Sequence, residues 1–136
     1  MKLIVCLDDN KGMMFNDRRQ SRDRVLIDDV VCMAKGKRLY IAEYSKTLFE
    51  GIDANIVIDD GMLDVAEEGD LCFVENKSLC AYACRAEEII IYRWNRSYPY
   101  DLAFDVDMKK EGFEIVSSED IAGYSHDKIT KEIYKR

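Results

Sequence analysis

The sequence predicts a single α/β domain with a mostly parallel central sheet, flanking helices and a C-terminal antiparallel strand pair. Up to residue 94, short apolar runs alternate with helical segments, which is typical of parallel strands joined by helices. Beyond residue 99, two segments instead alternate apolar and polar residues, as half-buried antiparallel strands do. A chain of 136 residues fits one domain, residues 1–136, with a core of ordinary size.

The strands are predicted from their apolar runs. Residues 3–7 are apolar throughout, which indicates a strand buried on both faces at the centre of the sheet. The other strands are predicted at residues 38–42, 54–58, 71–74 and 88–94, followed by the antiparallel pair at 113–117 and 129–134.

Helices are predicted between these strands. Ser21 is expected to cap a helix over residues 22–35, because a serine hydroxyl can accept a backbone N–H of the first turn. Gly36 suits the left-handed residue that ends such a helix. Shorter helices are predicted at residues 46–50, with Ser45 as the cap, and at 62–68 and 78–85.

Charge is unevenly distributed along the chain. The net charge is -7, yet Lys11 to Arg24 holds five basic residues against two acidic ones, so this segment is +3 and the remainder is -10. An acidic surface repels the phosphate backbone, so nucleic-acid binding is not expected. The basic loop, defined as residues 15–24, is the stretch suited to a small anion.

The apolar runs are too short to span a membrane, and no signal peptide or membrane association is expected. The five cysteines are odd in number and mostly lie within apolar runs. This pattern indicates buried thiols in the reducing cytoplasm rather than a disulfide framework. A monomer and a homodimer both remain open.

The basic loop is predicted to be the functional surface. Arg18, Arg19 and Arg22 can present forked donors to a phosphate or carboxylate, and Asp23 is the candidate general acid or base. Tyr92 lies on the same strand face as Trp94 and is expected to line an adjoining cleft. The alternative is a solvated loop whose arginines pair with acids of the same chain.

No residue set has the spacing of a zinc site, so no metal is expected. His126 is the single histidine and is interpreted as structural, because it has no neighbouring cysteine or serine motif of a known type.

The order of elements resembles dihydrofolate reductase, shortened. Gly12-Met13 stands where the reductase's mobile active-site loop opens, and Ser125-His126 precedes the last strand as a serine-histidine pair does there. Segments 3–13, 38–51, 88–105 and 112–134 carry the likeness. The resemblance implies the reductase fold over most of the chain. The chain is also similar to a family of small bacterial proteins to which no activity is assigned.

The residues that the resemblance would make functional match poorly. Asp23 falls near the reductase's pterin-binding acid. Glu75-Asn76 stands in place of a Gly-Gly pair that lets the backbone approach the cofactor pyrophosphate, and Glu43 replaces the basic residue that pairs with the 2′-phosphate. Like charges at both phosphate positions argue against NADPH binding, so NADPH-dependent reductase activity is not expected. No cofactor is predicted, and the question whether the chain is an enzyme leans toward no.

Three functions are weighed. The favoured one is a non-catalytic domain on a dihydrofolate reductase-like scaffold that binds a small anionic ligand or a protein partner through residues 15–24. The second is an enzyme of unknown specificity that uses Asp23 as general acid or base, and the third is a nuclease or nucleotide-processing protein. No nucleophile elbow, glycine-rich phosphate loop or histidine-based metal motif supports the last two.

Overall fold

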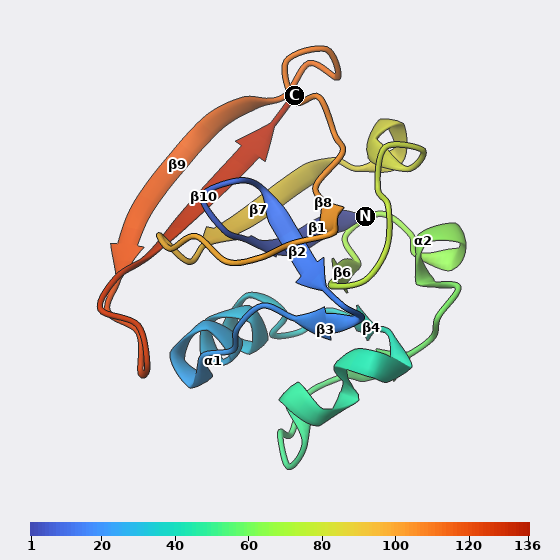
Figure 1. Cartoon of the computed structure of the whole chain (residues 1–136). Coiled ribbons are helices and arrows are strands. Elements are labelled where there is room, and N and C mark those ends of the chain that lie inside the picture. Colours follow the sequence, from blue (N-terminus) through green and yellow to red (C-terminus); the bar gives the residue numbers. More distant parts are fainter.

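A seven-stranded sheet forms the centre of the molecule, with strand order β5-β4-β6-β1-β7-β10-β9 (Figure 1). In the computed structural model, which describes residues 1–136, the first five of these strands are parallel, and β10 and β9 are added antiparallel. The strands are β1 Lys2–Leu7, β4 Leu39–Ile41, β5 Ile56–Ile58, β6 Leu71–Phe73, β7 Glu88–Arg93, β9 Glu114–Ile121 and β10 Ile129–Lys135. The predicted fold class is confirmed.

β1 lies in the middle of the sheet, as its continuous apolar run predicted, and pairs in parallel with β6 and β7. Its side chains point alternately to the two faces. Leu3 and Val5 join one hydrophobic cluster, while Ile4 belongs to the other. A strand with cores on both sides needs apolar residues at every position, which explains why the first segment shows no polar alternation.

Helical segments cover both faces of the sheet. The α-helix α1, Arg24–Met33, buries Leu26 and Val30 in the same cluster as the 3-10 helix η1, Glu43–Phe49. On the opposite face, the short helix α2, Met62–Val65, and the 3-10 turn η2, Ala83–Arg85, contribute to the other cluster. No helix of the structure combines the length and apolarity needed to cross a membrane.

The predicted helix starts need correction. α1 begins after Asp23, whose side chain accepts the N–H of Val25 at 2.9 Å, and Ser21 is not its cap. Ser45 is not a helix cap either. It lies inside η1, and its hydroxyl donates to Glu75. Serine and aspartate are both good caps, so composition alone does not choose between them.

Residues 78–85 form turns and a single 3-10 turn rather than the predicted helix. The N–H groups of Leu79 and Cys80 are taken by the carboxylate of Asp105, which lies far away in the sequence. Cys32, Cys80 and Cys84 are exposed, Cys6 is half-buried and Cys72 is buried, so the prediction that most thiols are buried is wrong. All five cysteines are free.

The basic loop is partly a hairpin, which the sequence analysis did not foresee. Strands β2, Gly12–Phe15, and β3, Arg18–Arg19, form a second sheet with β8, Leu102–Ala103. Asn16 and Asp17 turn the chain between β2 and β3 with positive φ angles of 53° and 59°. Asparagine and aspartate tolerate this backbone region better than other side chains, which suits them to a tight hairpin.

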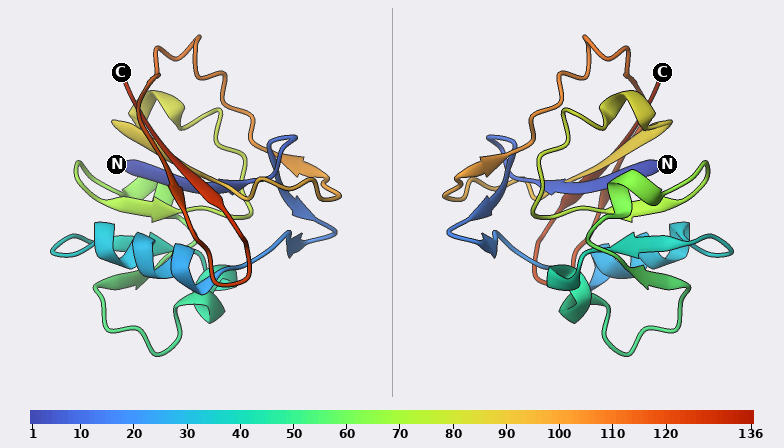
Figure 2. Two further views of the ribbon diagram at one scale, coloured as in Figure 1. Left: turned by 90° about the vertical axis from the view of Figure 1, so that its left-hand side faces the viewer. Right: turned by 90° about the vertical axis from the view of Figure 1, so that its right-hand side faces the viewer.

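The antiparallel hairpin of β9 and β10 returns the chain end to the sheet (Figure 2). The loop that joins the two strands, residues 122–128, reaches the beginning of α1. There the N–H of Tyr124 donates to the carboxylate of Asp23. Segments that are 101 residues apart in the chain therefore meet at one helix end.

An ion pair ties the small sheet to the large one. Arg19 on β3 donates from Nε to Oε1 of Glu75 at 2.8 Å and from Nη2 to Oε2 at 3.1 Å. Its guanidinium lies 4.6 Å from the ring centre of Tyr44, and the hydroxyl of Ser45 donates to Glu75 at 2.7 Å. The side chains of Arg19 and Glu75 are only 18% and 9% exposed, so each charge depends on the other for compensation.

Replacing Arg19 by alanine should lower the free energy of unfolding by about 3 kcal/mol, because it leaves the buried carboxylate of Glu75 uncompensated. Urea denaturation measures this change. The matched control is Arg18→Ala, which removes the same charge from an exposed position and should change stability by less than about 0.5 kcal/mol. Equal effects of the two changes would contradict a structural role for the Arg19 ion pair.

Candidate functional site

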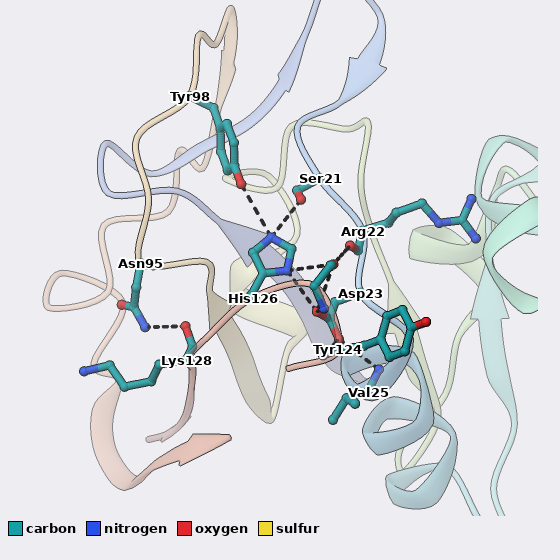
Figure 3. Close-up of polar contacts among 10 residues, drawn as sticks. Ser21, Arg22, Asp23, Val25, Asn95, Tyr98, Tyr124, His126 and Lys128 are labelled. Carbon is teal, nitrogen blue, oxygen red and sulfur yellow. Dashed lines mark hydrogen bonds and ion pairs between the residues drawn. The ribbon is translucent and has the colours of Figure 1, made fainter. Parts of the chain in front are cut away.

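The carboxylate of Asp23 is the centre of the candidate site (Figure 3). Its Oδ1 accepts the N–H groups of Val25 at 2.9 Å and Tyr124 at 3.0 Å. Its Oδ2 accepts the N–H of Ser125 at 2.9 Å and the hydroxyl of Ser125 at 3.2 Å, and lies 2.9 Å from Nδ1 of His126. One buried side chain thus joins the start of α1 to the loop between β9 and β10.

A glycine lets this loop approach so closely. A Cβ atom at Gly123 would lie 2.7 Å from Oδ2 of Asp23 and 2.7 Å from the carbonyl oxygen of His126. Because Oδ2 of Asp23 is held by hydrogen bonds to Ser125 and His126, any side chain at this position would push the loop away from the carboxylate.

The hydrogen bonds determine the charge of Asp23. Burial by itself opposes ionisation, but the N–H of Tyr124, the His126 ring and the N–H groups of Ser125 and Val25 outweigh it and hold the pKa of Asp23 well below its usual range. Asp23 is therefore a carboxylate at neutral pH. A carboxylate with so low a pKa is a weak proton acceptor, and its charge serves instead to orient His126.

His126 is buried between an acid and two hydroxyl groups. Because the carboxylate of Asp23 can only accept, Nδ1 of His126 carries a proton. Nε2 lies 2.9 Å from Oγ of Ser21 and 3.5 Å from the hydroxyl of Tyr98. The ring stacks on Trp94, with ring centres 4.7 Å apart. Asp23, His126 and Ser21 therefore form one hydrogen-bonded chain with a defined direction.

Two hollows adjoin this chain. The inner cavity is about 20 Å³, room for about one water molecule, and Ser21, Trp94 and Gln20 are among its lining residues. The outer groove is about 660 Å³ and lies along the start of α1. Arg22 and Asp23 line both hollows. The groove is also lined by Arg24, Asp28, Thr47, Glu50, Tyr124 and Ser125.

The structure separates the residues that the sequence proposed for the site. Arg19, Arg22 and Asp23 line the inner cavity, and Arg19 is paired with Glu75. Arg18 is exposed on β3 and lines neither hollow. Tyr92 is buried against α1, where its hydroxyl donates to Asp29, and it too lines neither hollow. Burial and Asp29 raise the pKa of Tyr92 well above its usual range.

Ser21 and His126 are the residues of the candidate site that the sequence did not predict. Ser21 was interpreted as a helix cap and His126 as structural, because each was considered with its sequence neighbours. The two side chains are 105 residues apart and meet only through the return of the β9–β10 hairpin. The Ser125-His126 pair before the last strand was the one signal that pointed to this loop.

Replacing Asp23 by asparagine should lower the free energy of unfolding at pH 7. It should also make this free energy depend less on pH in the acid range. The lowered pKa of Asp23 stabilises the folded state above the unfolded-state value of about 3.9, and this contribution is lost as the pH falls through the folded-state pKa. Urea denaturation between pH 2 and pH 5 should therefore give a shallower acid slope for the variant.

The control for this comparison is Asp53→Asn, at an exposed aspartate whose side chain makes no hydrogen bond. Its acid slope should match that of the unchanged protein. Parallel slopes for all three proteins would contradict the assignment of an ionised, hydrogen-bonded Asp23.

Comparison with known proteins supports the fold and leaves function open. No protein-family model and no curated protein sequence matches the chain. Among solved structures it is similar to dihydrofolate reductase from Enterococcus faecalis complexed with NADP(H) and RAB-propyl, with a TM-score of 0.64 and 11% sequence identity. The match covers 99% of this chain and 95% of that one. The chain therefore has a distant dihydrofolate reductase-like fold.

Proposed function

We propose that this chain is a binding domain, not a reductase, that takes a small anionic ligand in the groove at the start of α1. The observation that carries the proposal is the placement of Arg22. This arginine is exposed, lines both hollows, and has no ion pair with any acid of the chain. Its guanidinium points away from His126, so its donors are free for a ligand (Figure 3).

The surroundings of Arg22 suit an anion. The guanidinium of Arg24, which also lines the groove, lies 4.6 Å from the ring centre of Tyr124 and adds a second positive charge. The first turn of α1 adds the partial positive charge of a helix N-terminus. Forked arginine donors bind carboxylates and phosphates through paired, charge-assisted hydrogen bonds.

Two exposed acids of the groove restrict which anionic ligands can bind there. Asp28 and Glu50 also line the groove, and both are exposed. An anion without other polar groups would gain little there, because these carboxylates repel it. A ligand with an anionic group at the Arg22 end and a hydroxyl or amino group toward Asp28 and Glu50 would match both charges. A small zwitterionic or hydroxylated metabolite has this chemistry.

The positions that correspond to reductase phosphate contacts support a function other than NADPH chemistry. Glu75, which stands where the resemblance has a glycine of the Gly-Gly pair, is held by Arg19 and Ser45. Glu43 is exposed at the start of η1 and presents a negative charge at the position of the 2′-phosphate contact. Asp23, at the position of the pterin contact, is fully engaged by groups of this chain.

NADPH should not bind measurably. Glu43 and Glu75 carry carboxylates at the two positions where the resemblance has phosphate contacts. Isothermal titration calorimetry tests this, with the Enterococcus faecalis reductase, which was solved with NADP(H), as the positive control. A dissociation constant in the low micromolar range, about -8 kcal/mol, would overturn the expectation.

Replacing Arg22 by alanine should weaken binding of an anion that occupies the groove. Thermal-shift screening of phosphate, glutamate and adenosine monophosphate would identify the strongest binder, and calorimetry would measure its affinity. Losing one charge-assisted hydrogen bond costs about 1.5–3 kcal/mol, which weakens binding at least about tenfold.

Arg18→Ala is the matched control, because it removes the same charge from the same segment outside both hollows. It should leave the affinity within about twofold. An equal loss in both variants would show that general electrostatic attraction, and not the groove, holds the anion.

A further inference from the structure

We propose that Ser21 is a nucleophile activated by His126 and Asp23, and that the chain hydrolyses esters of small acyl groups. This inference goes beyond ligand binding in the groove and does not depend on it. It rests on the order of contacts from Asp23 through His126 to Ser21 and on the inner cavity beside the hydroxyl of Ser21.

The three side chains have the roles and spacing of a serine–histidine–acid system. Nε2 of His126 lies 2.9 Å from Oγ of Ser21, and Nδ1 lies 2.9 Å from Oδ2 of Asp23. Both distances fall within the range of a nucleophile bonded to its base and a base bonded to its orienting acid. With Nδ1 protonated toward Asp23, the lone pair of a neutral His126 is on Nε2 and faces Ser21.

The base, His126, is held in place by buried contacts, whereas the nucleophile, Ser21, is partly exposed. His126 is 5% exposed and stacks on Trp94, and Asp23 is 3% exposed and held by backbone N–H groups of the loop. Ser21 is only half-buried. A reagent can therefore reach the hydroxyl, while the base behind it stays in one orientation, as efficient proton transfer requires.

Other hydroxyl groups of the chain lack this arrangement. The hydroxyls of Ser45, Ser78 and Ser97 contact the carboxylates of Glu75, Asp105 and Asp9. Ser125 lies 3.2 Å from Nδ1 of His126, the nitrogen whose proton is directed to Asp23, so it is on the wrong side of the ring to lose a proton. Ser21 is the serine whose hydroxyl faces Nε2 at hydrogen-bonding distance.

The inner cavity limits the size of the acyl group that the substrate can carry. At about 20 Å³ it has no room for a long acyl chain, so esters of the smallest acyl groups are expected to react fastest. Oε1 of Gln20, a residue of the same cavity lining, is buried and has no hydrogen-bond partner in the chain. A hydrogen-bond donor entering the cavity would satisfy this oxygen.

The reaction balances without a cofactor. Oγ of Ser21 attacks the carbonyl carbon of the ester while its proton moves to Nε2 of His126. The tetrahedral intermediate collapses, the bond to the leaving oxygen breaks, and His126 gives its proton to the departing alcohol. Water then attacks acyl-Ser21 and transfers a proton to His126, which returns it to Oγ as the carboxylic acid leaves.

A fluorophosphonate probe tests the nucleophile in the full-length chain. Attack by Oγ of Ser21 would displace fluoride and leave one phosphonyl group, which intact mass and peptide mapping should place on Ser21. Ser21→Ala should lose this labelling by at least about a hundredfold. The control Ser97→Ala removes an exposed serine that contacts a carboxylate and should be labelled as the unchanged protein is.

Hydrolysis of p-nitrophenyl acetate provides the second readout. The unchanged protein should cleave it faster than p-nitrophenyl butyrate by at least about tenfold, because the cavity is small, and Ser21→Ala should lose the activity. Circular dichroism and the melting temperature would show that Ser21→Ala remains folded. No labelling of the unchanged protein, labelling of another residue, or equal rates for Ser21→Ala would each overturn the proposal.

The fluorophosphonate and the p-nitrophenyl esters are neutral, so their reaction with Ser21 does not require the proposed anion site. If Ser21 is not labelled but Arg22→Ala still weakens anion binding, the nucleophile proposal fails and the binding proposal stands. The reverse pattern of results would leave Ser21 as a nucleophile and remove the groove as an anion site.

Discussion

The burial of one ionised carboxylate, that of Asp23, decides how the ends of this chain come together. A buried carboxylate is tolerated only when hydrogen-bond donors surround it, and here most of those donors belong to the loop between β9 and β10. The same side chain caps α1. Forming the helix end, docking the terminal hairpin and orienting His126 are therefore consequences of a single requirement for charge compensation.

A second buried acid, Glu75, lines the same inner cavity and is compensated by an ion pair. Glu75 is matched by Arg19, which commits one arginine of the basic loop to structure. Arg22, next to the Asp23 cap, is left facing the groove. The net positive charge of residues 11–24 thus divides into a part that holds the two sheets together and a part that is available to a ligand.

The scaffold and its chemistry are separate properties here. The chain is similar in fold to a reductase over 99% of its length, at 11% identity. At the positions where the resemblance would place ligand contacts, Asp23 and Glu75 bind groups of their own chain. The same arrangement brings Ser21 and His126 together. One fold can carry different sites because the sheet positions the loops without determining their side chains.

The sequence by itself determined the class of fold, the central place of residues 3–7 and the approximate position of most strands, because burial on one or both faces leaves a local pattern of apolar residues. It also singled out Arg19, Arg22 and Asp23 through their local charge, and these three line one cavity. Only the tertiary structure decided that Asp23 and not Ser21 caps α1, that Arg19 pairs with Glu75, and that His126 joins Ser21 to Asp23. The Arg19–Glu75 pair and the His126 contacts link residues 56 to 105 positions apart, and no local pattern encodes them, because they depend on how distant segments are placed in the folded chain.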